Sequence, residues 1–516
     1  MSLASLSRRR LLTAAVAAPL LAAMPTARAH ARTAAARDDT LYARLNRITW
    51  GATPALLDTV RREGFERWLA GQLRPPASPD LPDSVRRGIA ALSISKHPSS
   101  ELAQALYQRS VANKDTRNPD EQARIRREIL AAQREPAKQA RERAAWLALY
   151  SPSQLQDQMT WFWMNHFNIW ANKGAVGTLV DEYESQAIRP HALGRFRDLL
   201  AASLRAPAML LYLDNHSSRA GKINENYARE LMELHTLGVD GGYSQRDVQE
   251  LARILTGVSV NLSGKPPKLK AALAGQLRQE GLFLFNPARH DFGDKTLLGK
   301  AIAGQGWQEV EQALDLLAAH PATARHISRK LAMLFISDQP SEALVRELAE
   351  QYQRSQGDIA ALLKHLFESE AFAASLDKGL FKDPVHYVYS ALRLALHDQP
   401  PITNPAAVVN LLQRLGQPLY GRLTPDGYGL RESDWNGSGQ MNTRFEVARA
   451  IALGAGVFYK EGEQRAPRVA LTRLVQAYGA DSPFALWPPA VRQAIAEART
   501  PDSNLYLLSA PPFMRR

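Results

Sequence analysis

Apolar residues recur at helical spacing along most of this chain, and the segment that begins near Ser153 shows the pattern most clearly. The large apolar side chains of that segment fall on one wide face of a helix: Leu155, Met159, Phe162, Trp163, Phe167 and Trp170. Further amphipathic blocks lie at 41–73, 84–150 and 224–237. The chain shows no repeat of about 20 to 50 residues, which would indicate a solenoid or a propeller. The sequence therefore predicts a mainly α fold, a single multi-helical globular domain over residues 38–516.

One short β element is expected within this helical fold. Phe283–Phe285 and the segment 296–298 are short and apolar, and a polar stretch rich in Asn, Asp, Pro and Gly separates them. Two such runs around a polar tip predict one short β-hairpin near 283–298.

The chain has 516 residues and no cysteine, which excludes disulfides, thiol nucleophiles, iron–sulfur clusters and Cys-ligated zinc. It also lacks the Gly-x-Ser-x-Gly elbow, the Gly-x-x-x-x-Gly-Lys phosphate loop and the Gly-x-Gly-x-x-Gly fingerprint. No nucleotide cofactor is therefore expected. Chemistry, if there is any, must rest on His, carboxylate, hydroxyl, amide, Arg and Lys groups, and a metal held by His and carboxylate ligands stays open.

The first 29 residues have the features of an export signal. Arg8, Arg9 and Arg10 precede a 13-residue apolar run over 11–23, and small residues at Ala27 and Ala29 offer a cleavage site. This pattern predicts a twin-arginine signal peptide over 1–29 and a periplasmic or secreted protein. No segment reaches the roughly 18 apolar residues of a membrane helix, so the mature chain should have no transmembrane segment. An uncleaved basic anchor is the alternative.

The net charge of +13 changes meaning once this leader is set aside, because four of the excess basic residues belong to it. The remainder holds 60 basic and 51 acidic residues, and the stretch 109–143 holds ten basic and six acidic ones at helical spacing. Interleaved signs are typical of a solvated helix face, and a one-sided basic stripe with stacking aromatics is missing, so no nucleic acid is expected as a partner. The residual positive charge favours an anionic polymer or an envelope surface.

Several polar residues lie in helical stripes that otherwise look apolar, where a charge needs a partner. His166 lies in the stripe that follows Ser153, and the alternative to a functional role is a neutral core histidine. Glu230 has apolar neighbours at helical spacing. Glu184 shares a face with Asp181, and Arg189 is the local partner expected for this acidic face.

Two further patterns have both a catalytic and a structural interpretation. His290 stands beside Asp291, which suits a base with an orienting acid, although a loop capped by its own side chains explains the pair equally well. Glu225 and Arg229 are four residues apart, which predicts an exposed ion pair on a helix and explains both without a function.

Several long motifs resemble the domain-of-unknown-function 1800 family: LNRITWGATP at 45–54, WMNHF at 163–167, IRPHALGRFRDLL at 188–200, PAMLLYLD at 207–214, NENYARELMELHTLGVDGGY at 224–243, HDxGxK at 290–295 and LGQP at 415–418. The resemblance covers nearly the whole mature chain. It implies a bacterial, largely helical and commonly exported protein whose gene often lies beside one for a sulfatase-like protein. It implies no reaction.

The polar residues of these motifs and their neighbours are expected to converge on one site. The candidate catalytic residues are Glu230, Glu184, His166, His290 and Asp291. The candidate substrate-binding residues are Asn165, Arg189, His191, Asp214, Asn215, Asn224, Glu225, Asn226 and His235.

Three functions suit such a site. The first is a hydrolase or lyase that uses buried carboxylate and His groups as acid and base on a cell-envelope or extracellular polymer, with Trp161, Trp163 and Trp170 as stacking surfaces. The second is a His/carboxylate metal enzyme, although neither Glu-x-x-His nor His-Glu-x-x-His occurs. The third is a non-catalytic binding or assembly partner of a sulfatase-like protein, with the polar residues as a structural network. Both enzyme hypotheses require Glu230, Glu184 and His166 to line one solvent-connected pocket.

Overall fold

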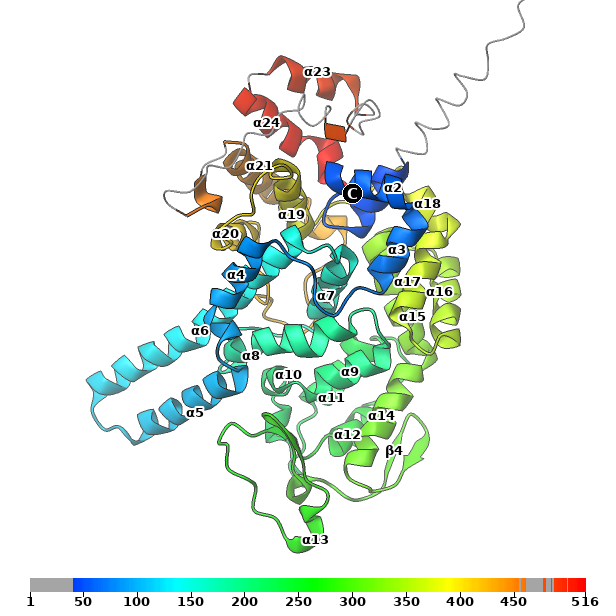
Figure 1. Ribbon diagram of the computed structural model, residues 1–516. Coiled ribbons are helices and arrows are strands. Elements are labelled where there is room, and N and C mark those ends of the chain that lie inside the picture. The colour runs from blue at the N-terminus through cyan, green and yellow to red at the C-terminus, as the bar shows by residue number, and fades with distance from the viewer. Residues whose placement is uncertain (1–39, 454–455, 461–476, 479–483, 485–486, 499) are drawn as a thin grey trace, which may run out of the picture.

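The computed structural model describes residues 40–453, 456–460, 477–478, 484, 487–498 and 500–516, so the predicted signal peptide lies outside the described residues. Within this part of the chain the fold is mainly α, as the periodicity predicts (Figure 1). None of its helices is both long enough and apolar enough to cross a membrane.

The helices of the first half are α2 (Pro54–Glu63), α3 (Phe65–Leu73), α4 (Asp83–Ala91), α5 (Ser99–Asp115), α6 (Pro119–Tyr150), α7 (Gln154–His166), α8 (Val176–Glu182), α9 (Phe196–Arg205), α10 (Pro207–Tyr212), α11 (Asn226–Glu230) and α12 (Gln245–Ile254). Two π-helical turns interrupt them, η2 (Tyr183–Ile188) after α8 and η5 (Leu231–Thr236) after α11. Short 3₁₀ turns are η1 (Ser93–Ser95), η3 (Arg189–His191) and η4 (Asn215–Ser217).

The second half contains α13 (Ala271–Ala274), α14 (Trp307–Ala319), α15 (Pro321–Phe335), α16 (Glu342–Arg354), α17 (Ile359–Glu368), α18 (Glu370–Ser375), α19 (Pro384–Ala395), α20 (Ala406–Arg414), α21 (Ser438–Ala452), α23 (Pro489–Glu497) and α24 (Thr500–Ser509). Its 3₁₀ turns are η6 (Pro287–Arg289), η7 (Glu432–Asp434), η8 (Gly456–Phe458) and η10 (Pro511–Met514).

Local sequence explains where several helices begin. Thr53 accepts a hydrogen bond from the backbone of α2, and Asn118 does the same for α6; a proline follows each of these caps. Ser244 and Asp247 form a reciprocal capping box at the start of α12.

Helix α7 lies in the middle of the molecule (Figure 1). Every residue of α7 except Trp161 is buried, including Asp157 and three glutamines. The sequence predicts one apolar face, and the structure instead encloses the helix on all sides. Its polar side chains therefore need partners inside the protein.

Helices α5 and α6 form a hairpin that projects from the body (Figure 1). This hairpin contains the charged stretch 109–143. Most of its side chains near the tip are exposed, while those near its base, such as Ala137 and Ala140, are buried.

The prediction of one β-hairpin near 283–298 is wrong, because Phe283–Phe285 does not pair with the segment 296–298. β3 (Phe283–Phe285) is the central strand of an antiparallel sheet with β1 (Val258–Val260) and β2 (Arg278–Glu280), and β4 (Lys295–Leu297) pairs with β5 (Lys300–Ile302). Leu298 and Gly299 have positive φ of 50° and 74°, which suits a tight two-residue turn that folds β4 onto β5 instead. The side chains of β3 are all buried, which shows that both faces of this central strand are covered.

Candidate functional site

The predicted site residues do not converge on one site. Glu184 and Arg189 line a buried cavity beside α7, and neither His166 nor Glu230 lines that cavity. His166 belongs to a histidine cluster, His290 and Asp291 to a polar network, and the predicted residues between Asp214 and Asn226 to one loop and the start of α11. Glu230, Glu184 and His166 therefore do not share one pocket, and the structure does not support a hydrolase, lyase or metal enzyme that relies on those three residues together.

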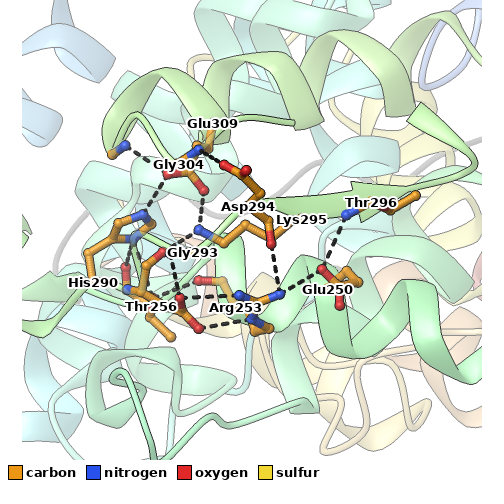
Figure 2. A network of polar contacts seen from close by, with 12 residues as sticks. Glu250, Arg253, Thr256, His290, Gly293, Asp294, Lys295, Thr296, Gly304 and Glu309 are labelled. Carbon is orange, nitrogen blue, oxygen red and sulfur yellow. Dashed lines mark hydrogen bonds and ion pairs between the residues drawn. The ribbon is translucent and has the colours of Figure 1, made fainter. Parts of the chain in front are cut away.

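His290 belongs to a polar network with a buried centre (Figure 2). Its Nε2 atom lies 2.9 Å from Glu309 Oε1, and its Nδ1 atom lies 2.8 Å from the carbonyl oxygen of Thr256. Lys295 donates to the second oxygen of Glu309, and the side chains of His290, Lys295 and Glu309 have no exposed surface. This part of the network is dry and satisfied, which is typical of a structural role.

Asp291 does not orient His290. Arg253 Nε donates to Asp291 Oδ2 at 2.8 Å, and the backbone N–H of Gly293 donates to Oδ1 at 2.9 Å. The interpretation of His290 and Asp291 as a base and its acid is therefore wrong. The acid beside His290 is Glu309 on α14, which the sequence could not indicate because only the tertiary fold brings α14 to this loop.

The side-chain amides of Asn215, Asn224 and Asn226, predicted to bind substrate, donate hydrogen bonds to backbone carbonyls instead. Asn215 Nδ2 donates to the carbonyl oxygens of Leu255 and Val258 at 3.2 and 2.8 Å. Asn224 Nδ2 donates to the carbonyl of Asp214, and Asn226 Nδ2 to that of Leu213, each at 3.1 Å. These amides therefore tie neighbouring turns and the start of β1 together through backbone carbonyls, which is a structural role.

The charged candidates of the same region form surface contacts. Glu225 pairs with Arg229 at 3.2 Å, as the spacing predicts, and Asp214 accepts from Lys173 at 2.8 Å.

Glu230 is half-buried at the end of α11, where burial first and then Glu233 raise the pKa of its carboxyl. His191 is half-buried on η3.

His166 lies in a cluster with His235, His326 and Lys330. Its Nε2 atom lies 3.0 Å from the carbonyl oxygen of His235, and Lys330 Nζ lies 2.9 Å from Nδ1. The ring centroids of His235 and His326 each lie 6.0 Å from that of His166. Burial lowers the pKa of all three histidines, and the nearby Lys330 lowers it further, so they are neutral at pH 7.

This cluster should make the protein sensitive to acid. Burial lowers the pKa of His235 to about 3, against a value of 6.5 in an unfolded chain. Below pH 6.5 the unfolded state therefore takes up a proton that the folded state refuses, and stability falls by about 1.4 kcal/mol per pH unit for this group. Urea denaturation at pH 7, 6 and 5 should show a shallower decline for His235→Leu than for the exposed control His97→Leu. Equal declines would contradict the assignment.

The described part of the chain contains no group of three or more His, Asp or Glu side chains arranged to hold a metal ion. The metal-enzyme hypothesis therefore has no ligand set among these residues to support it.

The cavity beside α7, here called the acidic pocket, has a volume of about 40 Å³. It is lined by Trp50, Ala144, Leu147, Ala148, Asp157, Thr160, Trp161, Met164, Glu184, Arg189, Tyr389, Leu419 and Tyr420. The carboxylates of Asp157 and Glu184 are both buried. Of the three expected stacking surfaces, Trp161 lines this cavity, whereas Trp163 is fully buried and its indole N–H donates to Ala192.

Two arginines accompany the carboxylates, in a different pairing from the expected one. Arg189 donates to Asp157, not to Glu184. Arg143 lies 2.5 Å from Asp181 and 3.2 Å from Glu184. Arg143 belongs to the charged stretch that the sequence assigns to a solvated face, and the packing of α6 along α8 buries it instead.

Glu184 lies within the π-helical turn η2, and His235 lies within η5. A π turn adds a residue to the helical repeat and shifts the faces that follow it, so spacing of 3.6 residues misplaces neighbouring side chains. Such turns occur frequently at functional sites. The sequence did not indicate Asp157 and Tyr420, which line the pocket, or Arg143, which contacts Glu184 from outside the lining.

Polar atoms of the acidic pocket lack partners among the described residues. Asp157 Oδ2, Arg189 Nη2 and Trp50 Nε1 are buried without a hydrogen bond. Buried polar groups normally have partners, and a cavity of this size has room for a water molecule or a small polar group of a ligand. Asp157 Oδ2 can therefore accept a hydrogen bond from a bound group, and Arg189 Nη2 and Trp50 Nε1 can donate one.

A loop over residues 417–428 covers the pocket and a second cavity of about 20 Å³ that shares Trp161, Met164, Leu419 and Tyr420 with it. Asn165 Nδ2 donates to the carbonyl oxygen of Tyr428 at 2.9 Å, and the N–H of Tyr428 donates to Asn165 Oδ1 at 2.7 Å. Asn165 thus positions this loop.

Gly427 lets the loop approach Asn165. Its φ is +75°, and an added Cβ would stand 2.1 Å from the carbonyl oxygen of Asn165. We expect Gly427→Ala to lower the free energy of unfolding by about 1–3 kcal/mol. Gly437→Ala, which meets no atom within 4 Å, should change it by less than about 0.5 kcal/mol. Thermal melts of both variants measure this, and equal melting temperatures would contradict the loop's role.

The fold and this pocket define a mainly helical protein with a buried pair of carboxylates at its centre. The family model described as "Protein of unknown function (DUF1800)" matches residues 43–515, and the chain belongs to this family. No curated protein and no solved structure matches it.

Proposed function

We propose that the protein is a hydrolase or lyase that uses Asp157 and Glu184 in the acidic pocket as acid and base on a cell-envelope or extracellular polymer. The observation that carries this proposal is the Asp157 carboxyl, which is buried at the cavity and whose Oδ2 atom has no hydrogen-bond partner among the described residues. His166, Glu230, His290 and Asp291 have no role in it.

Asp157 is suited to donate a proton. Burial raises the pKa of its carboxyl against the lowering effect of Arg189, which keeps more of the acid form present than in water. A general acid needs such a raised pKa and a free oxygen within reach of the leaving group. The Asp157 carboxyl has the raised pKa, and its Oδ2 atom is the oxygen without a partner.

Glu184 is suited to act as the base. Its two oxygens accept hydrogen bonds from Arg143 and from the hydroxyl group of Tyr420. The two acids therefore have different environments, which is the usual way to assign one acid and one base.

The aromatic lining fits a sugar-containing polymer. Trp50, Trp161, Tyr389 and Tyr420 surround the carboxylates, and ring faces suit the apolar faces of sugars. The cavity is small, and the partly exposed Trp161 lies among its lining residues.

The test is digestion of a polymer panel by the purified mature chain. The panel contains alginate, pectate, chondroitin sulfate, hyaluronan and peptidoglycan, and the measurements are new reducing ends and unsaturated products. We expect fragments from one of these polymers with the wild-type chain and none with Asp157→Asn plus Glu184→Gln. Equal digestion by the double variant would contradict the proposal.

We also propose export through the twin-arginine pathway to the periplasm or the medium, where such polymers occur. The support is the Arg8–Arg10 run and the apolar run after it. Arg8→Lys, Arg9→Lys and Arg10→Lys together should retain the protein in the cytoplasm, as cell fractionation would show. Unchanged export would contradict this route.

A further inference from the structure

A second and much larger cavity lies away from the acidic pocket. It has a volume of about 470 Å³, within the roughly 300–1,000 Å³ of ligand sites. Here it is called the α8–α10 groove. It is lined by Pro98, Ser100, Leu179, Glu182, Tyr183, Gln186, Ala187, Ala202, Arg205, Ala206, Pro207, Ala208, Glu280, Gly281 and Phe283.

One part of the groove wall consists of small side chains. Ala187 on η2 and Ala202 on α9 stand near Ala206 and Ala208 at the start of α10. Larger apolar residues at these positions would fill the space, as side chains normally do between packed helices. The wall therefore offers an apolar surface to a narrow aliphatic group.

Two carboxylates border this apolar wall. Glu182 at the end of α8 is half-buried, and Glu280 at the end of β2 is exposed at the turn beside Gly281. Neither forms an ion pair in the described part of the chain, although Glu182 is withdrawn from water far enough that burial raises its pKa. Glu182 is therefore a partly desolvated carboxyl that a cationic group of a ligand could pair with.

The one basic residue of the groove is already engaged. Arg205 donates to Glu311, and its guanidinium lies 5.2 Å from the ring centroid of Trp307. The other polar lining residues, Ser100 and Gln186, are neutral. The groove is thus locally negative in a chain whose net charge is positive.

We propose that the α8–α10 groove binds a small organic cation, a primary amine or guanidinium on a short aliphatic chain. The cationic group pairs with Glu182, the aliphatic chain lies along Ala202 and Ala206, and Glu280 adds attraction at the rim. This inference does not depend on the proposed function of the acidic pocket.

The test is calorimetric titration of the mature chain with cadaverine and agmatine. Both should bind with a dissociation constant below about 1 mM, which is within the affinity range of ligands of this size. Pentan-1-ol and valerate, which lack the cation, should not bind. Glu182→Gln should weaken cadaverine binding about tenfold or more, and Glu280→Gln only a few-fold because that carboxylate is exposed.

Glu230→Gln is the matched control, since Glu230 is also a half-buried carboxyl with a raised pKa and does not line the groove. It should leave the dissociation constant unchanged. Ala202→Leu, which fills the groove without changing charge, should abolish binding and covers the case in which Glu182→Gln does not fold. Failure of both amines to bind, full binding by Glu182→Gln, full binding by Ala202→Leu, or equal loss in Glu230→Gln would each overturn the proposal.

Discussion

Glu309→Gln should lower the free energy of unfolding by about 3–5 kcal/mol, the usual effect of removing one member of a buried ion pair. Glu309 accepts from His290, from Lys295 and from the backbone N–H of Gly306, and its side chain has no exposed surface. The substitution leaves the Lys295 ammonium buried without a counter-charge. It also weakens the attachment of the loop at 286–295 to α14.

Asp315→Asn is a suitable control on the same helix, because Asp315 pairs with Arg197 but its side chain is 64% exposed. Such surface pairs contribute about 0–1 kcal/mol. Chemical denaturation of both variants at neutral pH would measure the difference. Similar losses in the two variants would show that the network around His290 is less tightly coupled than its contacts indicate.

Asp157→Asn should lower the rate of polymer cleavage by about 10²- to 10⁴-fold, the range that general acid catalysis contributes. Asparagine keeps the size of the side chain and the contact with Arg189 but has no proton to donate to a leaving group. Binding of the polymer should change little. This prediction depends on the proposed function.

The pH profile separates a catalytic role from a structural one. Burial raises the pKa of Asp157, so the wild-type rate should fall as the pH rises through that pKa and the acid loses its proton. Asp157→Asn should lack this alkaline decline. Rates measured from pH 4 to 9, with thermal melts of each variant, would test it, and an unchanged alkaline decline in the variant would assign the proton to another group.

The fold class could be predicted from the sequence because helical periodicity is a local property. The caps at Thr53 and Asn118 and the ion pair of Glu225 with Arg229 are also local, since each involves residues close together in the chain. The pairing of β3 with β1 could not be predicted, because β1 is more than 20 residues away in the chain and the register depends on the sheet that forms.

The candidate site was predictable only in part. Helical spacing indicates Glu184 as an acid on an apolar face and Arg189 as its local partner, yet the partners that decide their chemistry, Arg143 and Asp157, come from other helices. The π turn at η2 also changes the faces that helical spacing predicts. His290 was recognised as well, but its acid is Glu309 on α14 rather than the adjacent Asp291.

The sequence by itself determined that this is a mainly helical, cysteine-free chain with polar residues in places where packing does not require them. The tertiary structure decided which of those residues meet. A charged group loses its hydration when it is buried, so each buried charge needs a partner inside the protein. Packing between helices and loops supplies the partners of Asp157, Glu184 and Lys295. Local spacing in the sequence does not encode this packing.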